Sequence, residues 1–264
     1  TALILNNLGY AMSENGENEK GLPLVEKSLE IRLRLLGNIH PDVAASMHNI
    51  GIIYRRLGYF DKAILYLQES LDIKTKLFGE NHPDVSGSYN EIGLIHYDDN
   101  NYEEAIKNYK KAIKILSDSI GANHIHVGIT YGNIGAAYKR MENYKDALSY
   151  YLKALSIYTH SYGKESIKLE PLLYNIGKMY YMLEDYDNAV VFMKKDLELC
   201  LLNRGENDMD VLYAWRALSA AYNKMGQFQN EKDCLRHIIE IGRLILDENN
   251  NGLQRAIKRY NEIK

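Results

Sequence analysis

Apolar residues recur at helical spacing along almost the whole chain, in pairs of stretches joined by short polar links. Between residues 41 and 58, one helix face is marked at positions i, i+3, i+4 and i+7 by Met47, Ile50, Gly51 and Tyr54. A second apolar stripe follows over residues 63–78. Two amphipathic helices with a short link form an antiparallel hairpin. The pattern therefore predicts an all-α protein built from helical hairpins.

The whole pattern repeats with a period of 42 residues. The segment His40-Pro-Asp-Val43 returns as His82-Pro-Asp-Val85. One small residue recurs at the same site of five successive units: Gly9, Gly51, Gly93, Gly135 and Gly177. A fixed period of this length is the sequence signature of a solenoid, in which each unit packs only on its neighbours. Six helix-turn-helix units are predicted over residues 1–247.

The segment 248–264 is predicted to form one further helix that caps the array. Leu253, Ile257 and Tyr260 stand there at the positions that Val43, Met47 and Ile50 hold in the second unit. The end of a solenoid needs such a cap, because its last unit has no following neighbour to cover its apolar face. The domain prediction is thus an array over 1–247 and a capping helix in 248–264.

Proline and histidine positions suggest where helices begin. Pro23 is expected in the first turn of a helix from Leu22 to Leu36, where its missing N–H is harmless. Before the first helices of three successive units stand His40, His82 and His124. Equivalent atoms of successive hairpins are about 16–20 Å apart, at two helix-packing distances, which is too far for one metal ion. These histidines are predicted to mark helix starts, and no metal site is predicted.

The order aromatic-x-x-Leu/Ile-Gly-x-x-Tyr, followed by alanine, resembles the tetratricopeptide repeat (TPR). Trp215 stands where that family has its tryptophan, three residues before Leu218 and followed by Tyr222. The 42-residue length, the His-Pro-Asp-Val opening and Leu5-Asn-Asn-Leu-Gly9 resemble the kinesin light chain branch of the family. The resemblance covers essentially the whole chain. It implies a right-handed TPR superhelix, an α-solenoid whose first helices line a concave surface.

The resemblance also implies a peptide-binding role for one asparagine in each repeat. In TPR proteins, an asparagine just before the Leu-Gly pair holds the ligand backbone, because a carboxamide can donate to a C=O and accept from an N–H at once. The matching residues are Asn7, Asn49, Asn133 and Asn175, with Glu91 and Ala217 in the two remaining units. Asn90 lies beside Glu91 and joins the predicted site. The alternative is that these asparagines only cap or bond their own helices.

Cationic and aromatic residues lie one turn further along the first helices. The cations are Arg55, Arg56, Lys139 and Arg140, with Lys178 nearby, and the aromatic residues are Tyr97 and Tyr181. Cations gathered in a concavity favour an acidic ligand. Kinesin light chains, which the chain resembles, take acidic motifs that carry an aromatic residue. The alternative is that arginine and lysine merely suit a helix C-terminus and solvent.

Composition narrows the function classes. The formal net charge of -3 gives no overall attraction for nucleic acid, and no apolar run is long enough to span a bilayer. Cys200 and Cys234 have no CxxC partner, which fits a reducing, cytoplasmic setting. No glycine-rich phosphate loop occurs, and no spacing gathers a catalytic triad. Neither a cofactor nor catalysis is therefore predicted.

These observations predict a non-enzymatic scaffold that binds an extended, acidic peptide segment of a partner protein. Two alternatives stay open. Because the chain opens on Thr1 within a helical pattern, the array is expected to be a piece of a longer protein. It could then be the sensor or regulatory arm of an enzyme such as a protease or glycosyltransferase. The concave surface could instead pack on a second copy and serve homo-oligomerisation.

Overall fold

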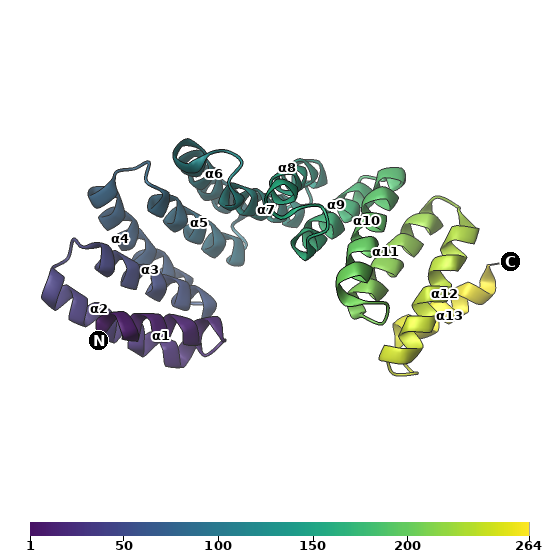
Figure 1. Ribbon diagram of the computed structural model, residues 1–264, viewed down its shortest axis with the longest axis horizontal. Coiled ribbons are helices and arrows are strands. Elements are labelled where there is room, and N and C mark those ends of the chain that lie inside the picture. Colours follow the sequence, from purple (N-terminus) through teal and green to yellow (C-terminus); the bar gives the residue numbers. More distant parts are fainter. Residues whose placement is uncertain (264) are drawn as a thin grey trace. The chain divides into compact units, whose positions relative to one another are not determined.

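The computed structural model describes residues 1–263, and these residues form helices and short links without any strand (Figure 1). The α-helices are α1 (Ala2–Glu14), α2 (Asn18–Leu36), α3 (Pro41–Arg56), α4 (Phe60–Phe78), α5 (Pro83–Asp98), α6 (Tyr102–Ile120), α7 (Ile125–Arg140), α8 (Tyr144–Tyr162), α9 (Glu170–Met182), α10 (Tyr186–Arg204), α11 (Met209–Lys224), α12 (Phe228–Ile245) and α13 (Asn251–Glu262). A short 3-10 helix, η1 (Ile167–Leu169), precedes α9. The all-α prediction is confirmed. Within residues 1–263, no helix is long and apolar enough to cross a membrane.

The chain divides into two compact units, Thr1–Ala137 and Tyr138–Lys264. In the first unit, α1 with α2, α3 with α4 and α5 with α6 form hairpins, and α2 and α4 each pack on the first helix of the next hairpin. In the second unit, α9 with α10 and α11 with α12 do the same, and α12 packs on α13. This order of helix contacts is that of an α-solenoid.

The predicted apolar stripes form the core of each unit. In the first unit, Ile50 and Ile53 of α3 and Leu67 of α4 are fully buried. The close approach of α3 and α4 depends on the recurrent glycine, because an ideal Cβ at Gly51 would lie 2.6 Å from Cγ of Leu67. In the second unit, Leu253 of α13 is 2% exposed, so the terminal helix carries a buried face. This helix falls inside the segment predicted as a cap.

The histidines that precede the first helices mark helix starts, as predicted. Nδ1 of His40 accepts a hydrogen bond from the backbone N–H of Asp42 at 3.1 Å, and His82 accepts likewise from Asp84 at 3.2 Å. His124 accepts from the N–H of His126 at 3.3 Å. Each imidazole therefore satisfies one backbone N–H of the first helical turn, which has no partner inside the helix.

The predicted start of the second helix is wrong. Helix α2 begins at Asn18, so Pro23 lies inside the helix and not in its first turn. The additional turn carries Gly21, where an ideal Cβ would lie only 2.3 Å from the carbonyl oxygen of Gly9. Residues 18–21 are polar or small, so apolar periodicity could not reveal a turn that packs through its backbone.

Candidate functional site

Asparagines of neighbouring first helices bond to one another in the first unit. Nδ2 of Asn49 on α3 donates to Oδ1 of Asn6 on α1 at 3.3 Å, and Nδ2 of Asn133 on α7 donates to Oδ1 of Asn90 on α5 at 3.2 Å. Each bond links first helices of successive repeats. It uses one of the two N–H groups of the donor carboxamide, which also has a carbonyl oxygen with two lone pairs. Asn49 and Asn133 thus tie the array together and retain hydrogen-bonding capacity.

Asn7 and Asn175 lie at the equivalent site with different partners. Asn7 is exposed, and its Oδ1 accepts from Nδ2 of Asn6 at 3.3 Å. Asn175 donates to the carbonyl of Pro171 in its own helix at 2.7 Å and accepts from Nζ of Lys139 at 2.8 Å. The sequence correctly places these side chains on the first helices, but it could not show that each already has a partner within the protein.

Carboxylates of adjacent repeats neutralise the two predicted arginines of the first unit. Nη1 of Arg55 donates to Oδ2 of Asp98 at 2.6 Å, and its Nε lies 3.7 Å from Oε2 of Glu91. Arg56 bonds to the carboxylate of Glu14, and its Nη1 donates to Oγ of Ser13 at 2.9 Å. Glu91, which interrupts the asparagine series, therefore has a structural partner in Arg55. Burial raises the pKa of Glu91, and the positive charge of Arg55 opposes that rise.

The cations of the second unit are arranged differently, because they lie near one another. Lys139 is half-buried, and its ammonium group donates to Asn175. Burial lowers the pKa of Lys139, and the like charges of Lys178 and Arg140 lower it further. Lys139 thus has two like charges close by, in a chain whose formal net charge is -3.

The two predicted tyrosines occupy equivalent surroundings on α5 and α9. Tyr97 meets Tyr102 edge to face with ring centroids 5.6 Å apart, and Tyr181 meets Tyr186 in the same way at 5.5 Å. Both predicted tyrosines are half-buried. Each therefore presents part of a ring whose orientation is held by the neighbouring tyrosine, an arrangement suited to contact with an apolar ligand group.

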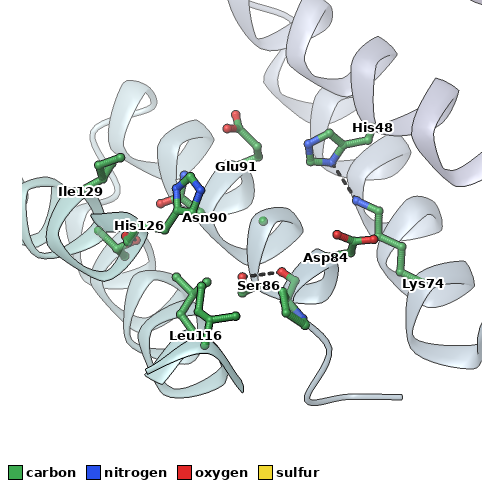
Figure 2. Close-up of a pocket in the computed structure, with 13 residues that line it drawn as sticks. His48, Lys74, Asp84, Ser86, Asn90, Glu91, Leu116, His126 and Ile129 are labelled. Carbon is green, nitrogen blue, oxygen red and sulfur yellow. Dashed lines mark hydrogen bonds between the residues drawn. The ribbon is translucent and has the colours of Figure 1, made fainter. Parts of the chain in front are cut away.

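A cavity of about 410 Å³ opens in the first unit, lined by the predicted Asn90 and by other residues that sequence patterns did not single out. Figure 2 shows Lys74 of α4 directed toward the imidazole of His48 of α3, with Nζ and Nδ1 3.4 Å apart. Nζ of Lys74 also donates to Oγ of Ser88 at 3.0 Å. The sequence signal that could have indicated Lys74 is Arg32, which lies 42 residues earlier. It is a cation at the same position of the second helix of its repeat.

A second cavity, of about 400 Å³, lies in the second unit and is lined by Lys139, Asn175 and several carboxylates. Arg204 pairs with Glu170 and with Asp210, both at 2.9 Å. Asp196 is 5% exposed, and its Oδ1 has no hydrogen-bond partner among the described residues. Burial raises its pKa to about 7, and the charges of Glu170 and Asp210 act in the same direction. The sequence signal that could have indicated this site is Asp196 itself, because the stripe of α10 that contains it is otherwise small or apolar.

The helical hairpins, the 42-residue period and the close glycine crossings define a repeat protein of the α-solenoid class. The chain belongs to the tetratricopeptide repeat family. One tetratricopeptide repeat model matches residues 1–76, 60–118 and 84–160, and a second matches residues 170–200. Among curated proteins, none matches this sequence.

Solved structures with this fold include kinesin light chain-like proteins. BtubC (BKLC) from P. vanneervenii is 21% identical, with 86% of this chain and 92% of that chain covered and a TM-score of 0.72. A putative kinesin light chain with TPR-like repeats from Podosopora anserina is 16% identical, with 76% and 95% covered and a TM-score of 0.64. These likenesses confirm the fold that the sequence predicts.

The fold also occurs as part of a larger signalling protein. A signal transduction ATPase with numerous domains and a tetratricopeptide repeat sensor, from Pyrococcus horikoshii, is 20% identical with a TM-score of 0.73. That match covers 98% of this chain and 41% of the ATPase. At this level of identity the likeness establishes a shared fold.

Proposed function

We propose that the chain is a non-enzymatic interaction scaffold that binds an extended, acidic segment of a partner protein along its first helices. The TPR fold is an interaction fold, and the group of Lys139, Arg140 and Lys178 beside Asn175 is the observation that carries the acidic preference. Like charges held close together are stabilised when an anionic ligand joins them. The asparagine amides supply contacts to the ligand backbone through the capacity that their internal bonds leave unused.

Selection of acidic side chains falls mainly on the second unit in this proposal. Arg55 and Arg56 already hold carboxylates of their own protein, so a ligand must displace Asp98 or Glu14 to reach them. An exchange of one carboxylate for another gains little free energy. Tyr97 and Tyr181 supply aromatic contacts, and Arg140 adds to the positive potential around Lys139.

Removal of the second-unit cations is expected to weaken binding of an acidic peptide. We expect Lys139→Ala with Lys178→Ala to lower the affinity for a labelled 12-residue Glu- and Tyr-containing peptide about tenfold to thirtyfold, since each partly exposed ion pair contributes about 1 kcal/mol. Fluorescence anisotropy measures this affinity. Affinity of the parent chain should also fall with added salt, which screens exposed charges.

The matched control removes two lysines from α6 and leaves the first helices intact. Lys107→Ala with Lys110→Ala changes the net charge by the same amount at exposed positions. This control should bind the acidic peptide as the parent does. Equal losses in both double variants, or equal affinity for a Lys-rich peptide of the same length, would contradict the proposed acidic preference.

The asparagines require a separate test, because two of them also hold the array together. Asn49→Ala is expected to remove the proposed contact with the backbone of the bound peptide. It should also lower the free energy of unfolding by about 1 kcal/mol, because the hydrogen bond to Asn6 is lost. Asn6→Ala breaks the same bond and leaves the Asn49 amide in place. A peptide affinity that falls in Asn49→Ala and not in Asn6→Ala supports ligand contact, whereas equal affinities in the two variants assign Asn49 a structural role alone.

A sensor role within a larger protein is the second candidate function. The likeness to the TPR sensor of a multidomain ATPase, over 98% of this chain, favours it. The same peptide-binding surface would then regulate a linked activity. Determining whether the encoded protein carries a further domain tests this candidate, which fails if none is found.

A further inference from the structure

Lys74 is a second-helix lysine whose amino group lies at the wall of a cavity in the first unit. The cavity, of about 410 Å³, is bordered by polar groups such as Ser86 and Asn90 and by the apolar side chains of Leu116 and Ile129 (Figure 2). Nζ of Lys74 is held by Oγ of Ser88 at 3.0 Å and lies 3.4 Å from Nδ1 of His48. The amine is therefore fixed in position next to space that a small molecule can occupy.

The buried surroundings of Lys74 disfavour its charged ammonium form. Within the described residues it forms no ion pair, and its two close partners are a hydroxyl and an imidazole. Burial lowers the pKa of Lys74 to about 8, although the charges of Asp84 and Glu91 act against this shift. Burial also lowers the pKa of His48 to about 3, so this imidazole is neutral near Lys74. The fifth helix around the cavity, α7, contributes His126, which is exposed.

The equivalent position one repeat earlier shows what a purely structural cation looks like. Arg32 is 4% exposed, and its Nη1 donates to the carbonyl of Asp42 at 2.7 Å and to Oγ of Ser46 at 2.9 Å. A guanidinium stays protonated in proteins and is no nucleophile. Lys74 keeps the serine contact of Arg32, but it replaces the guanidinium by an amine and borders a cavity. The second repeat thus has an amine beside a cavity where the first has a hydrogen-bonded guanidinium.

We propose that Lys74 is a covalent capture site for a small neutral aldehyde that enters this cavity. The neutral amine attacks the carbonyl carbon, and a carbinolamine forms. Its hydroxyl group then leaves as water with one proton taken from solvent, and the nitrogen forms a double bond to carbon. The product is a protonated imine with one positive charge. No oxidant or reductant takes part, and hydrolysis reverses the reaction.

Charge at the cavity favours a neutral ligand over an anionic one. Asp84 and Glu91 both line the cavity, so they repel a carboxylate or phosphate. The same two side chains stabilise the positive charge of the imine product. This inference does not depend on peptide binding, because the reacting group and the cavity belong to the first unit, whereas the proposed acidic selectivity resides in the second.

The test is reductive labelling of the intact chain with propanal and cyanoborohydride, followed by peptide mass mapping. We expect Lys74 to be labelled at least about tenfold faster than the exposed Lys107 and Lys110 at pH 7.5, because a larger fraction of its amine is unprotonated. Its labelling rate should be half-maximal near pH 8. Labelling of Lys74 no faster than that of the exposed lysines would overturn the proposal and leave Lys74 as a structural residue like Arg32.

Two variants keep the result interpretable. Lys74→Arg restores the pairing seen at Arg32 and should retain the helical circular dichroism signal while the fast label disappears. Ile129→Trp places a large side chain at the cavity wall and should slow labelling of Lys74 without changing that of Lys107. An unchanged rate at Lys74 in Ile129→Trp would overturn the cavity as the binding site, and persistence of the fast label in Lys74→Arg would assign the reaction to another residue.

Discussion

Replacement of Asp196 by serine should stabilise the second unit at pH 8 by about 2–4 kcal/mol. Burial raises the pKa of Asp196 to about 7, so between about pH 4 and pH 7 the folded chain keeps a proton that the unfolded chain releases. Stability therefore falls as the pH rises through this window, by about 1.4 kcal/mol per pH unit, and levels off above it. Serine carries no charge at any of these pH values, so it removes this loss.

Serine is also the residue that other repeats use at this position. Oγ of Ser28 donates to the carbonyl of Ala2 at 2.7 Å, and Oγ of Ser70 donates to the carbonyl of Ala44 at 2.7 Å. By the 42-residue period, a serine at position 196 faces the carbonyl of Glu170. The replacement thus supplies a donor of a kind already accommodated twice in the first unit, together with the loss of a buried charge.

Urea unfolding at pH 5 and pH 8, followed by tryptophan fluorescence, measures the effect. Trp215 on α11 is the chain's single tryptophan, so its signal reports the second unit. The gain from Asp196→Ser should be larger at pH 8 than at pH 5. Asp210→Ser removes a more exposed carboxylate that pairs with Arg204 and should give no gain. A stabilisation of Asp196→Ser that is equal at the two pH values would contradict an ionisation effect.

The fold could be predicted because the same pattern of apolar residues recurs in successive repeats along the chain. A single apolar stripe is ambiguous, but six stripes in register at one period leave few architectures. Helix starts were predictable for a similar reason, since His40 and His82 each accept from an N–H two residues later. The start of α2 escaped prediction, because its first turn packs through the backbone of Gly21 and leaves no apolar pattern.

The site was less predictable than the fold, because charge balance depends on neighbours across repeats. The sequence of its own helix gives Arg55 no partner. In the structure, however, its Nη1 lies 2.6 Å from Oδ2 of Asp98 on the first helix of the next repeat. Among the described residues, Lys139 forms no such ion pair, and burial together with the like charge of Lys178 lowers its pKa. From residue type alone, Arg55 and Lys139 are both predicted to belong to one surface that binds an acidic ligand. Because Arg55 is already paired, our proposal places the acidic preference mainly in the second unit.

Equivalent positions also diverge in ways that a repeat consensus conceals. The position of Lys74 is occupied in the other units by Arg32, Leu116, Tyr158, Cys200 and Gly242. An arginine, a lysine, three less polar residues and a glycine thus follow one another at a single site of the repeat. The positions that recur in every repeat define the solenoid, and the cavity beside Lys74 lies at a position that differs between repeats. Function in such an array is therefore sought where one repeat departs from the next.

Gly87 and Gly93 both lie on α5, but only Gly93 lies against a neighbouring helix. Replacing each by alanine therefore distinguishes the packing role of glycine from its effect on helix stability. Gly93→Ala is expected to destabilise the first unit by about 1–3 kcal/mol, because overpacking of a well-packed core has that effect. An ideal Cβ there would lie 2.6 Å from Cε1 of Tyr109, whose ring is fully buried and cannot move into solvent. Gly87→Ala should instead stabilise by up to about 1 kcal/mol, since alanine is the better helix former.

The two substitutions form a matched pair, because each adds one methyl group to the same helix. At Gly87 no atom lies within 4 Å of the added Cβ, so only the backbone preference changes. Urea unfolding followed by far-ultraviolet circular dichroism should move the midpoints in opposite directions. Destabilisation of equal size in both variants would mean that the helix tolerates no side chain at either site. A neutral Gly93→Ala would mean that Tyr109 can yield, and the close crossing of α5 and α6 would then not depend on glycine.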